Sequence, residues 1–119
     1  MQSKQDILDL INQATGTTMY HRYSSFPGYP VVTDGVIAVA EAAECFWFLD
    51  IIGSYQTNKD LDPEFQVWTL EVFADQTAIV AAYNDTELII TQDIPYTDFP
   101  LEKFKVYLIQ GVILLPGEY

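Results

Sequence analysis

FQVWTLEVFADQTAIVAAYNDTELIITQDI, residues 65–94, carries the clearest secondary-structure pattern in the sequence. It contains three runs rich in β-branched and aromatic residues, at 65–73, 77–83 and 87–94. Short polar breaks around ADQ and NDT separate these runs and are the right length for hairpin turns. The stretch therefore predicts three consecutive antiparallel strands.

The sequence after this stretch is less regular. Residues 95–102, PYTDFPLE, break the strand pattern, and Pro100 suits a short helical turn. Residues 104–116 then resemble a hairpin with Gln110-Gly111 as its two-residue turn. A helix over 101–109 is the competing interpretation, because apolar residues in this segment also recur at helical spacing.

The sequence before this stretch is mostly helical in character. Apolar residues at helical spacing predict a first helix over about 4–14, with Ser3 as its cap and Thr15-Gly16 as its end. Two further helices are expected at about 34–42 and 45–55, because one continuous helix would leave no clean polar stripe. Either Thr33 or Asp34 can cap the first of this pair.

One strand is expected between these helical regions. Residues 17–24, TTMYHRYS, are rich in Thr and Tyr, and the prolines and glycine of FPGYP, residues 26–30, indicate a turn. Helices followed by strands indicate an α+β fold. We expect a single domain over 1–119, with an antiparallel sheet of about five strands and with the N-terminal helix and the central helical pair packed on one face.

Composition excludes several classes of function. The 119 residues include 17 acidic and 5 basic residues, for a net charge of −12, so the chain has too few cations to neutralise nucleic acid phosphates or anionic membranes. Residues 45–53 form a nearly apolar run, but it is far too short to span a membrane. Cys45 is the only cysteine, which excludes an internal disulfide and makes the cytoplasm the expected location.

The only histidine and the only arginine stand side by side, at His21 and Arg22. On a strand, neighbouring side chains point to opposite faces, so Tyr20 and Arg22 share one face and His21 lies on the other. One hypothesis is that Arg22 grips a carboxylate or phosphate beside Tyr20. The alternative is structural: a half-buried histidine among aromatic residues, and an arginine paired with one of the many acids.

A second candidate surface lies on the helix expected at 45–55. Its two apolar stripes leave Trp47, Asp50 and Ser54 on the remaining face, so that face is expected to be partly exposed. Exposed patches of Trp and Tyr usually mark protein interfaces. The candidate binding residues are therefore Tyr20, Arg22, Trp47 and Asp50.

No catalytic or metal-binding constellation stands out. One histidine and one cysteine are too few for a structural zinc site, and Cys45 lies in an apolar run where a buried, inert thiol is usual. Asp60, Asp62 and Glu64 alternate as at the start of a calcium loop, but the glycine needed for the sharp turn is missing. No cofactor is expected, and a carboxylate-based enzyme stays open because 17 acids can pair in many ways.

Several segments together resemble a known family of small, uncharacterised bacterial proteins, a domain of unknown function. The most specific ones are Thr33-Asp34-Gly35, Trp47 to Asp50, Thr97 to Pro100 and Leu115 to Tyr119. The resemblance spans nearly the whole chain. It implies one compact domain, and it implies no activity, cofactor or catalytic residue.

Three functions are compatible with these observations. The first is a small, acidic, non-enzymatic protein-interaction module that binds a protein partner or a second copy of itself. The second is a carboxylate-based enzyme or a small-anion-binding protein that uses Arg22. The third is an acidic inhibitor of a nucleic-acid-binding protein, which requires the acids to concentrate on one face.

Overall fold

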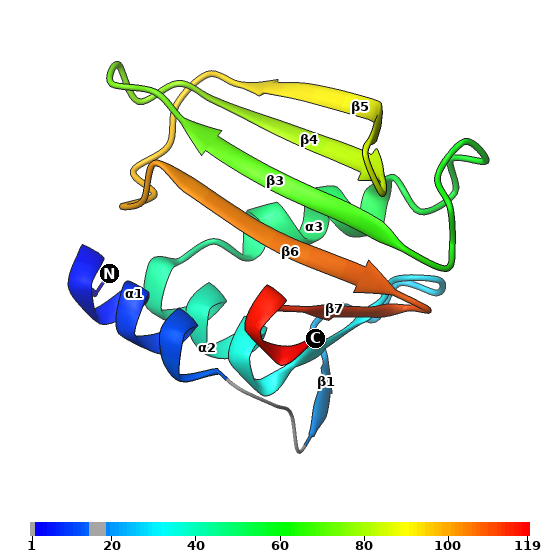
Figure 1. Ribbon diagram of the computed structural model, residues 1–119, viewed down its shortest axis with the longest axis horizontal. Helices are drawn as coiled ribbons and strands as arrows, with labels where there is room; N and C mark the ends of the chain where they lie inside the picture. Colours follow the sequence, from blue (N-terminus) through cyan, green and yellow to red (C-terminus); the bar gives the residue numbers. More distant parts are fainter. Residues whose placement is uncertain (1, 15–18) are drawn as a thin grey trace.

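The computed structural model describes residues 2–14 and 19–119 as an α+β fold (Figure 1). Its helices are α1 (Lys4–Gln13), α2 (Asp34–Ala43), α3 (Phe46–Ser54) and the short 3-10 turn η1 (Pro116–Glu118). Its strands are β1 (Tyr20–Arg22), β2 (Val31–Thr33), β3 (Gln66–Val72), β4 (Ala78–Asn84), β5 (Glu87–Ile94), β6 (Lys103–Ile109) and β7 (Val112–Leu114). The strands form one sheet in the order β1-β2-β7-β6-β3-β4-β5.

The expected three-stranded meander is confirmed. β3 pairs with β4 and β4 with β5, both antiparallel, and residues of positive φ turn the chain at Gln76 and Asp85. The Asp75 carboxylate accepts hydrogen bonds from the Thr77 backbone and hydroxyl, at 3.1 and 2.6 Å, which closes the first of these turns. A register shift at Ala82/Tyr83 interrupts the second pairing.

The C-terminal hairpin is also confirmed, and a helix over 101–109 is wrong. β6 and β7 pair antiparallel around Gln110 and Gly111, whose φ angles of 49° and 83° are those of a tight hairpin turn. The helical turn expected at Pro100 is wrong as well, because residues 95–102 contain no helix. Phe99 and Leu101 are both buried there, in an irregular segment with bends at residues 100–102.

The expectation of about five antiparallel strands needs correction, because the sheet has seven strands and is mixed. The strand expected at 17–24 is observed only at 20–22, and residues 15–18 lie outside the described residues. The unexpected strand is β2, which pairs antiparallel with β1 and parallel with β7. A three-residue strand is too short to show an alternating pattern, and its parallel partner lies far away in the sequence.

The helices agree with their predicted positions to within one residue at each end. Ser3 accepts a hydrogen bond from the Asp6 backbone at 3.2 Å, and Thr33 caps α2 by accepting from the Val36 backbone at 3.2 Å. Glu44, in the left-handed conformation, separates α2 from α3. Within the described ranges, no helix is long and apolar enough to cross a membrane.

The sheet has one covered and one open face. α3 passes behind β3 and β6, and no helix lies in front of β3, β4 or β5 (Figure 1). On the inner face, which the helices cover, Trp68 pairs in register with Ala82 and Val106, and all three are buried. This core also includes Phe48 and Leu49 of α3.

Candidate binding surface on the outer face of the sheet

The outer face consists of the side chains of β3, β4 and β6 that point away from the helices. Alternation along each strand places them there, one residue out of step with the buried set. In register across the three strands, the outer face carries three rows: Tyr83, Val67 and Tyr107; then Ala81, Thr69 and Lys105; then Ile79, Glu71 and Lys103. The rows therefore change from aromatic at one end to charged at the other.

The aromatic end is the most apolar part of this face. The ring of Tyr107 lies 5.4 Å from that of Phe65 and 5.6 Å from that of Tyr119, measured between centroids. Tyr119 is 74% exposed, and Leu88, opposite Tyr83 on β5, is 52% exposed. Aromatic and aliphatic side chains thus run across the face, most of them half-buried, and Tyr119, which follows η1, packs against Tyr107.

The charged end carries Lys103 and Lys105, two of the five basic residues of the chain. Both are exposed, and in the described part of the chain neither has a carboxylate oxygen within 4.0 Å of its ammonium group. The Lys105 ammonium lies 5.7 Å from the centroid of the Tyr107 ring. Glu71 stands opposite Lys103 in register, whereas Lys105 stands opposite Thr69 and faces no acid across the strand.

A hollow of about 380 Å³ lies in this face. Thr69, Glu71, Tyr83 and the two lysines line it. Its size falls within the range of ligand pockets, and its lining combines an aromatic ring, two hydroxyl groups, two cations and the carboxylate of Glu71, so the cations outnumber the anion by one. This surface can bind a group that has both apolar area and negative charge.

Tyr20 and Arg22, two of the four predicted site residues, lie together on the edge strand β1. Both are exposed and His21 between them is half-buried, as strand alternation predicts. The His21 imidazole Nε2 lies 2.5 Å from Oδ1 of Asp34, at the start of α2. Among the described residues, no acid lies within ion-pair distance of Arg22.

Trp47 and Asp50, the other two, lie on α3. Trp47 is half-buried with its ring edge against Phe48, while Asp50 is exposed. Tyr23 donates a hydrogen bond to the carbonyl of Leu49, on the same helix, at 2.7 Å. Burial raises the pKa of Tyr23, and the Asp50 charge raises it further.

The structure does not bring the four predicted residues together. In the part of the chain that is described, no hydrogen bond, ion pair or ring contact joins Tyr20 or Arg22 to Trp47 or Asp50. The predicted residues therefore form two separate pairs, one at the sheet edge and one on a helix.

The remaining reactive groups are held in structural roles. Cys45 is buried, and burial raises the pKa of its thiol to about 12, so the nucleophilic thiolate is scarce at neutral pH. The Glu118 carboxylate accepts hydrogen bonds from the Thr33 hydroxyl at 2.7 Å and the Leu115 backbone at 3.0 Å, which ties η1 to the start of α2. Over residues 2–14 and 19–119, no three His, Cys, Asp or Glu residues are grouped so as to hold a metal ion.

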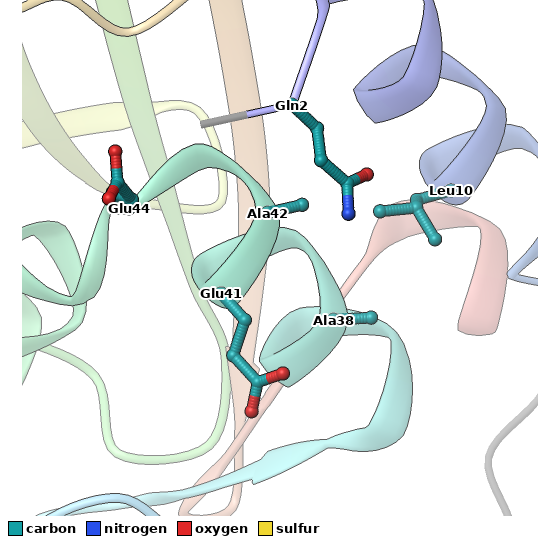
Figure 2. A pocket seen from close by; sticks show the side chains of 6 residues that line it. All are labelled: Gln2, Leu10, Ala38, Glu41, Ala42 and Glu44. Atoms are coloured by element: carbon teal, nitrogen blue, oxygen red, sulfur yellow. The ribbon is translucent and has the colours of Figure 1, made fainter.

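A second hollow, of about 460 Å³, lies between α1 and α2. It is lined by Gln2, Leu10, Ala38, Glu41, Ala42 and Glu44. Figure 2 shows the two glutamates pointing in different directions, so their carboxylates do not converge on a common point. This arrangement offers no defined cation site.

Sequence reasoning missed the outer face, although the signal was present. Lys103, Lys105 and Tyr107 alternate with the buried residues of β6, and Val67 and Thr69 alternate with those of β3. The alternation shows that these residues share a face. Whether that face stays open depends on where the helices pack, which is not a property of any single strand.

Comparisons with known proteins agree with the resemblance to a domain of unknown function. Searches of curated proteins and of solved structures each returned no significant match. One family model, described as a family of unknown function (DUF6876), matches residues 5–119. The chain therefore belongs to the DUF6876 family of unknown function.

Proposed function

We propose that this protein is a small, non-enzymatic, cytoplasmic protein-interaction module that binds an extended segment of a partner protein across the outer face of its sheet. The observation that carries the proposal is the aromatic end of that face, where Phe65, Tyr107 and Tyr119 pack on one another and Tyr119 is 74% exposed. The cytoplasmic location rests on Cys45, a free and buried thiol.

Aromatic side chains that are already held in place are good anchors for a partner. Tyr and Trp are enriched among the residues that dominate binding energy, because they bury a large area and lose few rotamers. The mutual contacts of Phe65, Tyr107 and Tyr119 restrict their rings before a partner arrives. The entropic cost of binding is correspondingly smaller.

A protein partner fits this face better than nucleic acid or a second copy of the chain. A net charge of −12 on each chain opposes both nucleic acid binding and close association of two copies. The acids occupy α1, α2, α3, the loop before β3 and the turns of the meander, and this spread does not favour nucleic acid mimicry. Arg22 is exposed at the sheet edge and lines neither hollow described above, so a second function based on it has no supporting observation.

Site-directed photo-crosslinking in the source cells tests the proposal. A photoreactive amino acid at Thr69, on the outer face, should give a crosslink to one discrete partner protein. The same group at Thr57, exposed in the loop after α3, is the matched control and should not give that crosslink. Adding Tyr107→Ser should abolish the Thr69 crosslink, whereas Tyr96→Ser, at a 64% exposed tyrosine after β5, should leave it unchanged.

Two outcomes would contradict this proposal. A crosslink that appears equally from Thr57, or that survives Tyr107→Ser, would show that the outer face is not the binding surface. A Thr69 crosslink between two copies of this chain, together with a dimeric mass in solution, would replace partner binding with self-association.

A further inference from the structure

We infer that the segment that binds the outer face is acidic, with a carboxylate placed at Lys103 and Lys105 and an apolar side chain placed beside α1. This inference rests on the proposed function and specifies the chemistry of the partner. It comes from the lysine pair and from a further hollow next to it, neither of which the fold requires.

The two lysines have no ion-pair partner among the described residues. The chain has 17 acidic residues, yet in the described residues no carboxylate oxygen comes within 4.0 Å of the Lys103 or Lys105 ammonium group. Strand geometry places the two Cα atoms about 7 Å apart on the same face, so one carboxylate can reach both ammonium groups. Lys105, opposite Thr69 and beside the Tyr107 ring, is the less compensated of the two.

A hollow lies on each side of the two lysines. The hollow in the outer face has a neighbour of about 420 Å³ on the far side of β6, and Lys103, Phe104 and Lys105 line both. The neighbouring hollow is mainly apolar, with Leu8 and Ile11 of α1 on one wall and Leu101 and Pro116 nearby. Both hollows therefore meet at the lysine pair.

The length of this path favours a peptide segment. From β4 across β3 to β6 is about 10 Å at the usual strand spacing, and the hollow that α1 lines lies beyond β6. An extended segment covers about 20 Å with six residues. The segment that fits has an apolar residue that contacts Tyr83, a carboxylate that contacts the two lysines and a second apolar residue that packs against α1.

The charges around the lysine pair determine whether an acidic or a basic segment binds there. The net charge of −12 attracts basic segments to most of the surface and repels acidic ones. On the outer face, two lysines against the single Glu71 leave an excess of positive charge, which reverses this preference locally because a basic segment would place like charges together there. An acidic segment is therefore directed to this face by repulsion elsewhere as well as by attraction here.

The test uses three labelled eight-residue peptides in which Leu and Phe alternate with Glu, with Gln or with Lys. Affinity is measured by fluorescence polarisation, and the binding surface is mapped from amide shifts in NMR spectra. The Glu peptide should bind at least tenfold more tightly than the Gln peptide and should shift the amide signals of β3 and β6. The Lys peptide should bind more weakly than either at these strands.

Charge reversal provides the decisive variant. Lys105→Glu should lower the affinity for the Glu peptide at least tenfold and should leave the Gln peptide within a factor of two. Lys59→Glu changes the net charge by the same amount at an exposed loop, and it should leave the difference between the two peptides intact. Lys103→Gln should have a smaller effect than Lys105→Gln, because Glu71 already faces Lys103.

Failure of the inference can be distinguished from failure of the proposed function. Equal affinities of the Glu and Gln peptides, with shifts on the outer face, would overturn the acidic partner and keep the face as a binding surface. Absence of shifts with every peptide at millimolar concentration would overturn the inference. The Thr69 crosslink would then decide separately whether the face binds a partner.

Discussion

The two faces of the sheet arise from the same strands but have opposite characters. On β3, Trp68 is completely buried against the helices, and its neighbour Thr69 lies on the open face. On β6, Phe104 and Val106 belong to the core, and Lys103 and Lys105 between and beside them are exposed. One face therefore holds the fold together, and the other is available for binding.

Under the proposed function, a chain of 119 residues assigns stability and recognition to opposite faces of the same strands. The inner face has packing and hydrogen bonds that are satisfied internally, such as the bond from Trp68 Nε1 to the Gln66 side-chain oxygen at 2.8 Å. The outer face has aromatic rings and lysines whose removal leaves no buried cavity. Substitutions should therefore affect stability on one face and binding on the other.

Trp68→Ala, on the inner face, should destabilise the protein more than any other substitution considered below. Truncating a fully buried tryptophan removes apolar contacts and leaves a cavity, so the free energy of unfolding should fall by about 3–5 kcal/mol. Thr69→Ala, one residue away on the outer face, should cost less than about 1 kcal/mol. Urea unfolding followed by circular dichroism measures both, and similar losses for the two variants would refute the division between the faces.

A smaller effect is expected where α3 meets the loop between β1 and β2. A Cβ atom on Gly53 would overlap the Tyr29 ring and would lie 2.9 Å from the Tyr23 hydroxyl. Gly53→Ala should therefore destabilise the fold by about 1–3 kcal/mol through overpacking. Ser54→Ala, at the exposed neighbouring position, is the control and should stay within about 0.5 kcal/mol in thermal or urea unfolding. Unchanged stability of Gly53→Ala would mean that the loop does not pack on α3.

Unfolding at alkaline pH should show whether water reaches the Cys45 thiol on the covered side of the sheet. The folded Cys45 thiol has a pKa raised to about 12, whereas in the unfolded chain it ionises near pH 9. Above pH 9 the unfolded state therefore loses a proton that the folded state keeps, and stability falls as pH rises. This single group contributes a slope of about 1.4 kcal/mol per pH unit between these two values.

Comparing the wild type with Cys45→Ala isolates that contribution, since ionising tyrosines affect both proteins. Unfolding free energies from urea titrations at pH 8, 9, 10 and 11 should decline less steeply for the variant. Parallel curves would mean that the thiol ionises equally in both states and that water reaches it in the folded protein.

The meander and the C-terminal hairpin could be predicted from local sequence alone. Alternating residues such as Phe104, Lys105 and Val106 define a strand, and Gln110-Gly111 adopts the positive φ angles that its turn requires. β2 could not be predicted in this way. Its three residues are stabilised by pairing with β7, which lies about 80 positions later in the chain, so no local pattern records them.

The candidate surface was predictable only in part. Local sequence shows that Lys105 and Tyr107 share a face, but it does not show that this face is the open one. Trp47 and Asp50 lie on a partly exposed helix face, whereas Tyr20 and Arg22 lie on an edge strand and, among the described residues, make no hydrogen bond, ion pair or ring contact to them. Bringing residues from β3, β4 and β6 together requires the register of the sheet, which depends on contacts distant in sequence.

Removing the charges of the outer-face lysines should leave the free energy of unfolding almost unchanged. Replacing both outer-face lysines, in Lys103→Gln with Lys105→Gln, should alter the free energy of unfolding by less than about 0.5 kcal/mol. Lys4→Gln with Lys59→Gln makes the net charge equally more negative and accounts for added self-repulsion. A loss above about 1 kcal/mol relative to this control, measured by urea unfolding, would show that the lysines support the fold. Their lack of ion pairs would then no longer argue for a ligand.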